Sequence, residues 1–338
     1  MYLLECHQIS KSYGSMKAVQ GLDLLLEQGF IYSLMGPSGC GKTTILRLIA
    51  GLEIPDNGRI ILRGELVNDP QIKIPPEKRK VSMVFQGLAL WPHMTVEKNL
   101  TFVLSHLPKK DRIERAEERL EMFGLFNRAK AFPHELSEGE RQRVALARSL
   151  ITEPDFLLLD EPFANLDRLL KKILLQQIVE IKQRDMITIL FVTHDQEEAL
   201  RVADMLLIMH DGKIIQQGTP EEIYRNPSSP FAAHFLGPGS VVKGNIRDHK
   251  IVCTLGTFTA KDNAKNGEVL LLFRPEDISI SHADHQGIKA VVKYNSYHGG
   301  RWLCQVEVSG NVFSLWTQSP PAVGSTISLK VINAPAVI

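Results

Sequence analysis

Residues 36 to 43 read Gly36-Pro37-Ser38-Gly39-Cys40-Gly41-Lys42-Thr43, and this stretch decides the fold. It matches the G-x-x-x-x-G-K-[ST] phosphate-binding loop, with a short apolar run before it (Phe30 to Met35) and a helical pattern after it (Thr44 to Ala50). Its glycines let backbone N–H groups close around an anion, and the helix N-terminus adds positive partial charge. Lys42 would reach the β- and γ-phosphates, and the Thr43 hydroxyl would hold Mg²⁺. A glycine-rich turn with a buried lysine does not explain the Lys-Thr pair, so the sequence predicts binding of a nucleoside triphosphate.

The composition bounds the class of protein. A length of 338 residues is comfortable for two domains, and a hydrophobic content of 44% supports a sizeable core. The balance of 39 Lys and Arg against 38 Asp and Glu carries no basic footprint, so no nucleic-acid partner is expected. The cysteines lack metal-ligand spacing and indicate reduced thiols in a cytosolic protein: Cys6, Cys40, Cys253 and Cys304.

Membrane association is expected to come through a partner. The first residues, Met1 to Glu5, lack the basic and apolar regions of a signal peptide, so none is expected. The apolar runs of the chain are far shorter than the roughly 20 residues that a membrane-spanning helix needs. A chain of this kind reaches a membrane by binding to proteins that span it.

Two patterns divide the chain. Through residue 236, short strands alternate with helical segments, which predicts an α/β domain with a parallel sheet covered on both faces. The apolar run Phe156 to Leu159 predicts a buried central strand whose C-terminal end carries the chemistry. Beyond Leu236-Gly237-Pro238-Gly239, short strands dominate and predict a small β-barrel. We therefore expect a nucleotide-binding domain in residues 1–236 and an all-β domain in residues 237–338.

Four further motifs follow the phosphate-binding loop. Asp160 and Glu161 end the apolar strand, and adjacent strand residues point to different sides, which suits separate roles. Asp160 would hold Mg²⁺, directly or through water, and Glu161 would polarise the attacking water. His194 follows another buried strand and could bind the γ-phosphate, although a lone histidine is more often structural. Gln86 ends a further strand, where it could sense Mg²⁺ or the water, and Leu136 to Arg143 starts a helix.

In this order, the motifs resemble those of the ATP-binding cassette (ABC) ATPases, a family of P-loop NTPases, over about residues 1 to 236. The resemblance implies catalytic roles for Glu161, His194, Gln86 and Lys42, and Mg²⁺ ligation by Thr43, Gln86 and Asp160. It further implies contacts to ATP from an adenine-stacking Tyr13, from the Walker A residues Gly36, Pro37, Ser38, Gly39, Cys40, Gly41, Lys42, Thr43 and Thr44, from the signature residues Ser137, Gly139 and Glu140, and from Asp167 of the D-loop Asn165-Leu166-Asp167. An aromatic residue at a strand end, such as Tyr13, is as often only a residue at the edge of the core.

The resemblance also implies an assembly. Two copies would form a head-to-tail dimer, with each ATP between the phosphate-binding loop of one copy and the signature helix of the other. Closing and reopening of this dimer would move helices in integral membrane permease subunits, which receive solute from an external binding protein. The chain would then be peripheral, at the cytoplasmic face of the inner (cell) membrane.

The signature departs from the family pattern. The norm is Leu-Ser-Gly-Gly-Gln, whereas this chain has Leu136-Ser137-Glu138-Gly139-Glu140. Ser137 with Glu140 three residues later matches a capping box, so the structural role at the helix N-terminus is retained. Two carboxylates near a triphosphate should weaken closure unless Arg141 or Arg143 compensates. We therefore expect an active ATPase with a weaker ATP-bound dimer.

Two stretches favour an importer. Leu90 to Val96 follows Gln86 closely, and in the family this stretch lines the groove for a permease helix; ordinary loop packing is the alternative. Leu271 to Ile278 resembles the strand and turn of the regulatory, OB-like β-barrel found after sugar, polyamine, sulfate and ferric-iron importer ATPases. Phe235 to Val242 and Ala290 to Val306 look most like the ferric-iron subgroup. The expected function is ATP hydrolysis that energises solute uptake, with ferric iron first and phosphonate, polyamine, thiamine or sulfate as alternatives.

Two other classes remain open. A soluble ABC protein of DNA repair or translation usually carries a long coiled-coil insert or two cassettes, whereas this chain has one cassette and no sustained heptads. A regulatory subunit that does not hydrolyse ATP would suit the altered signature. The intact residues Lys42, Asp160, Glu161 and His194 argue against it.

Overall fold

The computed structural model describes residues 2–164, 166–261, 265–281 and 287–338. They form two compact units, Met1–Pro220 and Glu221–Ile338, which are described separately below. Helix α8 (Pro230–Phe235) lies in the second unit, whereas the sequence places the domain boundary after it. Asn165 of the predicted D-loop lies outside the described residues. None of the helices within the described ranges is long and apolar enough to cross a membrane.

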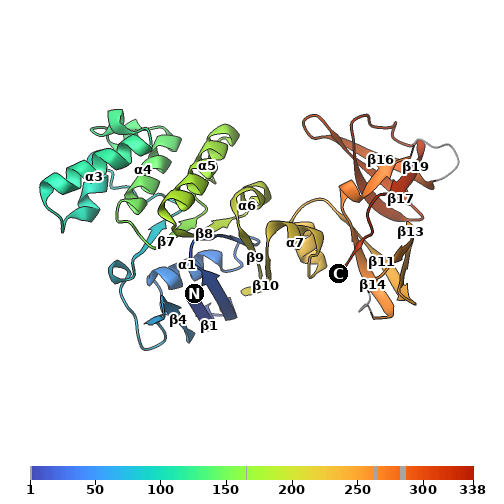
Figure 1. Cartoon of the computed structure of the whole chain (residues 1–338), viewed down its shortest axis with the longest axis horizontal. Helices are drawn as coiled ribbons and strands as arrows, with labels where there is room; N and C mark the ends of the chain where they lie inside the picture. The colour runs from blue at the N-terminus through green and yellow to red at the C-terminus, as the bar shows by residue number, and fades with distance from the viewer. Residues whose placement is uncertain (1, 165, 262–264, 282–286) are drawn as a thin grey trace. The chain divides into compact units, whose positions relative to one another are not determined.

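A six-stranded sheet forms the centre of the first unit (Figure 1). Its strands are parallel except for the edge pair of β9 and β10. In sheet order they are β10 (Lys213–Gly218), β9 (Met205–His210), β3 (Ile31–Met35), β8 (Thr188–Thr193), β7 (Phe156–Asp160) and β6 (Val81–Val84). The predicted α/β class and the buried central strand are confirmed, and β3, β7 and β8 are buried along their whole length.

The two faces of this sheet belong to different cores. Leu157 and Leu159 of β7 pack with a helical layer, and Phe156 and Leu158 pack on the opposite side with α1 and a second sheet (Figure 1). The helices of the unit are α1 (Lys42–Ala50), α2 (Val96–Thr101), α3 (Lys109–Met122), α4 (Glu138–Leu150), α5 (Arg168–Asp185) and α6 (Gln196–Val202). Because side chains alternate along a strand, one run of apolar residues fills both cores.

The second sheet of this unit is antiparallel, with the order β2-β1-β4-β5. Its strands are β1 (Tyr2–Tyr13), β2 (Met16–Glu27), β4 (Asn57–Leu62) and β5 (Glu65–Asn68). A turn at Gly14 joins β1 and β2, with a φ of 59° at the glycine. One face of the parallel sheet is therefore covered by α1 together with strands.

Arg79 fastens the C-terminal end of α1. Its side chain is fully buried and donates hydrogen bonds to Leu48 O (3.1 Å) and Ile49 O (2.8 Å) in the last turn of the helix. The same guanidinium donates to Val67 O (2.8 Å) and Ile74 O (2.7 Å). Burial lowers the pKa of Arg79 to about 10, which leaves it charged at neutral pH. The cation satisfies carbonyl groups that a helix end leaves without partners, and it thereby holds α1 against β5.

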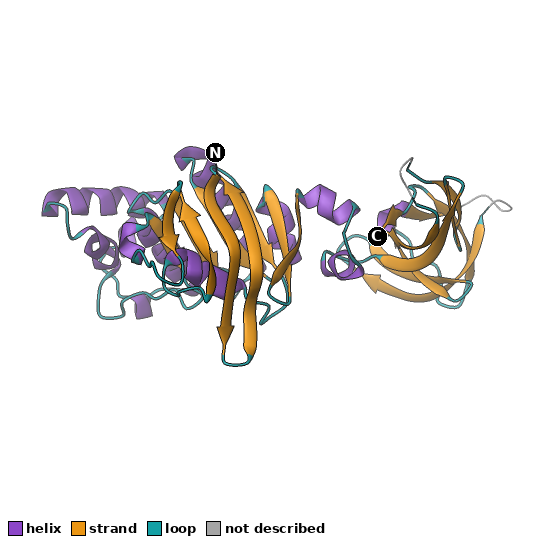
Figure 2. Cartoon of the chain, turned by 90° about the horizontal axis from the view of Figure 1, so that it is seen from below, coloured by secondary structure: helices purple, strands orange, loops and turns teal. Residues whose placement is uncertain are grey.

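The second unit contains the small β-barrel that the sequence predicts, preceded by two short helices that it does not predict. Its strands form two antiparallel sheets that curve around one apolar core (Figure 2). The first sheet has β13 (Gly256–Thr259), β12 (Lys250–Cys253), β11 (Ser240–Arg247), β14 (Gly267–Phe273) and β20 (Ala336–Val337), and the second has β15 (Ile278–Ile280), β19 (Thr326–Val331), β16 (Ile288–Tyr297), β17 (Trp302–Val308) and β18 (Asn311–Thr317).

Arg274 joins the helices of the second unit to its strands. It follows β14, is 3% exposed, and donates to the carbonyl oxygens of Tyr224 (2.8 Å) in α7 (Pro220–Arg225) and of Ala233 (2.9 Å) in α8. Its guanidinium also stacks on the Tyr224 ring, 4.0 Å from the ring centroid. The bond from Arg274 to Ala233 O explains why α8 belongs to the second unit.

The role of Arg79 yields a stability prediction. Arg79→Met removes four buried hydrogen bonds and should destabilise the first unit by about 3 kcal/mol. Urea unfolding followed by circular dichroism measures the loss, and Arg59→Met, at an exposed arginine of β4, is the matched control. Equal stability of the two variants would contradict a role for Arg79 in fastening α1.

Candidate active site

The phosphate-binding loop is confined by the strands around it. Gly36, Pro37, Ser38, Gly39, Cys40 and Gly41 form the loop between β3 and α1, and Lys42, Thr43 and Thr44 begin the helix. A Cβ atom at Gly36 would lie 2.3 Å from Met209 O, and one at Gly41 would lie 2.0 Å from Ala18 O. Gly41 also has a φ of 107°. Both positions therefore require glycine, because backbone approaches from β9 and β2.

Lys42 lies inside this loop. Its side chain is buried, and Nζ donates to Gly36 O (2.8 Å) and Pro37 O (2.9 Å). The ammonium group is therefore held within the ring of backbone that would surround the phosphates. Backbone N–H groups and a fixed cation make this loop a binding site for an anion.

Thr43 and Asp160 meet at the end of β7. Thr43 Oγ1 donates to Asp160 Oδ1 over 3.0 Å, although the two residues are far apart in the sequence. Asp160 is 5% exposed, and this burial raises its pKa, while the Thr43 hydrogen bond acts in the opposite direction. The sequence assigned both residues to Mg²⁺, and the structure brings them together.

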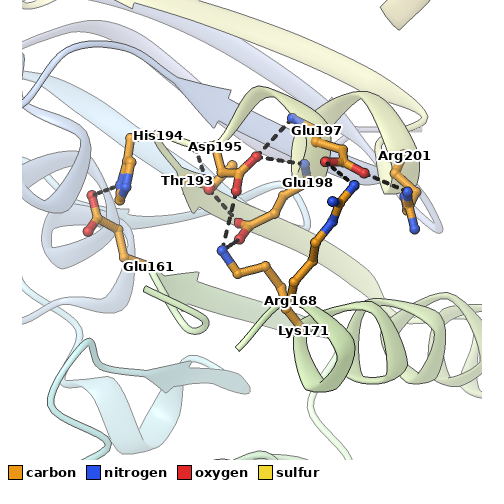
Figure 3. A network of polar contacts seen from close by, with 9 residues as sticks. All are labelled: Glu161, Arg168, Lys171, Thr193, His194, Asp195, Glu197, Glu198 and Arg201. Carbon is orange, nitrogen blue, oxygen red and sulfur yellow. Dashed lines mark hydrogen bonds and ion pairs between the residues drawn. The ribbon is translucent and has the colours of Figure 1, made fainter. Parts of the chain in front are cut away.

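Glu161 gathers the other predicted catalytic groups. Gln86 Nε2 donates to Glu161 Oε2 over 3.2 Å. His194 Nδ1 lies 3.4 Å from Glu161 Oε1, as Figure 3 shows. The three residues follow β6, β7 and β8, so neighbouring strand ends bring them together. The expectation that Asp160 and Glu161 alternate along a strand needs correction. The strand ends at Asp160, and Glu161 has a left-handed backbone (φ 44°), with its N–H bonded to Val192 O.

A polar network behind His194 was not anticipated from the sequence (Figure 3). Buried Glu198 accepts from Thr193 Oγ1 (2.5 Å) and pairs with Lys171 Nζ (2.7 Å). Lys171 also pairs with Asp195 Oδ2 (3.3 Å), and Asp195 caps α6. The Thr193–Glu198 hydrogen bond, the cap at Asp195 and the two ion pairs of Lys171 thus hold the loop on which His194 lies. The capping pattern of Asp195 is visible in the sequence, but its pairing with a helix elsewhere in the chain is not.

Lys171 lies in the first turns of α5, the helix that Asp167 caps. Asp167 accepts hydrogen bonds from Leu169 N and Leu170 N, both at 3.0 Å. Asp167 therefore organises the helix start, and its predicted contact with ATP stays a prediction. Through Lys171, this helix is tied to the loop of His194.

The signature residues begin α4. Ser137 is the N-cap and forms the predicted capping box with Glu140. Glu138 pairs with Arg141, as one of the two expected compensations requires. Within the described residues, Arg143 forms no ion pair with Glu138 or Glu140. The partner of Glu140 is Arg128, from the 3₁₀ helix η3 (Phe126–Arg128), which sequence reasoning missed.

The structure does not bring the signature residues to the phosphate-binding loop of the same chain. Within the described parts of the chain, the side-chain hydrogen bonds of Ser137 and Glu140 involve each other and Arg128, and those of Lys42 and Thr43 stay within the phosphate-binding loop and at Asp160 of β7. A Cβ atom at Gly139 would meet the Leu170 side chain at 2.1 Å. The signature therefore packs toward α5, and its contacts with ATP stay a prediction.

Two further predicted positions lie at the surface. Tyr13, at the end of β1, is 42% exposed and has Lys11 Nζ 5.7 Å from its ring centroid. It is therefore not buried in the core, and its stacking on adenine stays a prediction. In the stretch Leu90 to Val96, Trp91 is only partly exposed, because it contacts Phe102 and lies under Arg148 at 4.7 Å. The exposed residues of this stretch are Pro92 and His93.

Arg148 joins the signature helix to the segment that follows Gln86. It donates to Ala89 O (2.7 Å) and Leu88 O (2.9 Å), two residues with left-handed backbones. Burial lowers the pKa of Arg148, but an arginine remains charged at neutral pH. A movement of the segment Leu88 to Trp91, called the Trp91 loop below, would therefore displace Arg148 and with it α4.

Comparison with known proteins agrees with this geometry. The family model described as ABC transporter matches residues 19–164. The chain is 43% identical over 314 residues to the Fe(3+) ions import ATP-binding protein FbpC of Rhizobium etli, which covers 90% of this chain and 88% of that protein. It is 38% identical to the protein of the same name from Mannheimia succiniciproducens, covering 89% and 87% of the two chains.

Solved structures resemble the nucleotide-binding part. The dimeric, post-hydrolysis ATP-binding cassette MJ0796, bound to ADP and Pi, superposes with a TM-score of 0.58 at 28% identity and covers 64% of this chain and 98% of its own. CbiO1 of Clostridium perfringens, part of the transporter complex cbiONQ, gives a TM-score of 0.59 at 26% identity, with coverages of 66% and 90%. The recognition made from the motifs is confirmed: the chain belongs to the ABC transporter family of ATP-binding proteins and is an ABC-type ATPase.

Proposed function

We propose that the chain is the ATP-hydrolysing subunit of an ABC importer and that it energises uptake of ferric iron. The observation that carries the ATPase assignment is the meeting of Gln86, Glu161 and His194 beside the loop that holds Lys42. The iron assignment is supported by relatives at 38% to 43% identity whose names state Fe(3+) import.

In this proposal, the groups near the triphosphate divide binding and hydrolysis between them. Lys42 and the loop N–H groups bind the phosphates, as do Ser38 and Thr44 at either side of the helix start. Glu161 accepts a hydrogen bond from the attacking water and polarises it, while His194 contacts the γ-phosphate and Gln86 orients Glu161. Tyr13 stacks on adenine. Lys171 and Glu198 hold the loop that carries His194, and this fixes the backbone of His194 at the ends of the strands.

The residues beside Lys42 fit Mg²⁺. A hydroxyl, a buried carboxylate and an amide oxygen are hard oxygen donors of the kind this ion prefers, and Thr43 with Asp160 already forms such a pair. Thr43 and Asp160, with Gln86, would hold the ion. When bound, Mg²⁺ would neutralise charge on the phosphate oxygens.

The proposed assembly follows from the divided site. Because the signature lies away from the phosphate-binding loop of its own chain, a second copy placed head to tail would bring Ser137, Gly139 and Glu140 to each ATP. Permease subunits would contact Leu90 to Val96, beside Gln86, and would receive solute from an external binding protein. The chain would then be a peripheral protein at the cytoplasmic face of the membrane.

Asp160 should trade stability for function. Asp160→Asn should lower ATP turnover at least about 100-fold, because the variant loses the anionic Mg²⁺ ligand. Burial raises the pKa of Asp160, so its ionised form destabilises the folded chain, and the variant should unfold at a higher temperature at pH 8. The gain should shrink as the pH falls through the raised pKa, where the wild-type carboxyl is also neutral. Calorimetry without nucleotide measures this, and a lower unfolding temperature at pH 8 would contradict it.

The permease contact can be tested at His93. His93→Glu places a negative charge on an exposed part of the Leu90 to Val96 stretch and should reduce uptake about 10-fold, while turnover of the purified chain changes less than about 2-fold. His106→Glu, at an exposed histidine outside the stretch, is the control. Equal uptake by both variants would remove this stretch from the permease contact.

The whole proposal is tested by uptake of radiolabelled ferric iron into cells that lack the chain. Complementation with wild type should restore uptake, and Glu161→Gln should not, because removing a base costs about 100-fold or more in turnover. Purified Glu161→Gln should still bind ATP. Unchanged iron uptake without the chain would overturn the iron assignment, and full turnover in Glu161→Gln would overturn the role of Glu161.

A further inference from the structure

The hydroxyl of Ser137 is already bonded within the signature. Ser137 N and Ser137 Oγ both donate to Glu140 Oε2, each over 2.8 Å, and Ser137 Oγ accepts from Glu140 N over 3.3 Å. Ser137 is one of the residues that the proposed function brings to ATP on the other copy. If its hydroxyl binds a phosphate oxygen there, the hydrogen bond that it now donates to the Glu140 carboxylate must shift to that oxygen when two copies close.

The carboxylate of Glu140 is ionised and held from its other side. The pKa of Glu140 is lowered, first by the hydrogen bond from the Ser137 backbone, then by the Ser137 hydroxyl and by Arg128. Arg128 Nε donates to Glu140 Oε1 over 3.0 Å, and the Glu140 side chain is 17% exposed while that of Arg128 is 53% exposed. The nearby Glu138 has its own cation in Arg141. Without Arg128, a carboxylate with no cationic partner would face the triphosphate.

The segment that carries Arg128 is also connected to the Trp91 loop through α2. The residues after it accept backbone hydrogen bonds from the first turn of α2: Val96 N donates to Ala131 O and Glu97 N to Ala129 O, both over 2.9 Å. Helix α2 begins where the stretch Leu90 to Val96 ends. The backbone that follows Arg128 is thus hydrogen-bonded to the start of α2, where the segment that the proposed function assigns to the permease ends.

We propose that Arg128 is a positioning residue for ATP-driven dimerisation. Its guanidinium holds the Glu140 carboxylate against Ser137 and neutralises the charge of that carboxylate. The γ-phosphate of ATP on the other copy can then accept the hydrogen bond of the Ser137 hydroxyl. The inference rests on the proposed head-to-tail dimer. In this chain, an arginine from a separate short helix makes an acidic signature compatible with ATP. Arg128 should therefore matter only while Glu140 is present, and Glu140 should weaken dimerisation most when Arg128 is absent.

A double-mutant cycle tests this in full-length chain carrying Glu161→Gln, which should bind ATP without hydrolysing it. The ATP concentration that gives half-maximal dimer, measured by sedimentation velocity, is compared between this parent and five variants of it. Arg128→Ala should raise it about 10-fold, and Arg128→Lys by no more than about 3-fold, because a cation remains. Glu140→Gln should lower it, and Arg128→Ala in the Glu140→Gln background should change it less than about 2-fold. Arg115→Ala, which breaks the exposed pair with Glu153 (3.6 Å) in the same helical layer, is the control and should have no effect.

The outcomes separate this inference from the function on which it rests. An equal effect of Arg128→Ala with Glu140 and with Gln at position 140 would overturn the inference, because the arginine would then act independently of the carboxylate. A loss that Arg128→Lys does not relieve would also overturn it, since it would indicate packing rather than charge. If the Glu161→Gln parent forms no dimer at saturating ATP, the proposed dimer itself fails, and the inference fails with it.

Discussion

Burial of the central parallel strands on both faces is the constraint on which the rest of the structure depends. Strands β3, β7 and β8 carry apolar side chains into two separate cores, so their middles have no room for charged groups. Charged residues can lie only where the strands end. Lys42 and His194 follow β3 and β8, and Asp160 ends β7, so the three residues share one edge of the sheet. The site is a consequence of how the sheet is covered.

Within that edge, a single backbone conformation separates the two acids. Asp160 remains in β7 and faces Thr43, whereas the left-handed backbone of Glu161 places its carboxylate with Gln86 and His194. A left-handed non-glycine residue costs about 1 to 3 kcal/mol and persists where the surroundings hold it. Here the bond from Glu161 N to Val192 O holds it. The strained backbone at Glu161 gives the two adjacent carboxylates different partners.

Arginine side chains connect separate segments at several places in the molecule. Arg79 caps the phosphate-binding helix, Arg148 joins α4 to the segment after Gln86, Arg128 and Arg141 neutralise the signature acids, and Arg274 holds α8 on the barrel. Each guanidinium supplies several donors in a fixed plane, so one side chain can join two or more segments. Of these contacts, only the Glu138–Arg141 pair has the short helical spacing that a sequence reveals.

The phosphate-binding loop, the all-β tail and the buried strands that lead to the loop and to its partner motifs could all be predicted from the sequence alone. These features are local: glycines at tight turns, apolar runs, a cap followed by a helix. The tertiary structure alone decided that strands as well as α1 cover one face of the sheet, that α8 joins the barrel, and that Glu140 pairs with Arg128 and Lys171 with Glu198. The physical reason is that such pairs form between side chains of different elements, whose approach is set by packing and leaves no periodic trace in the chain.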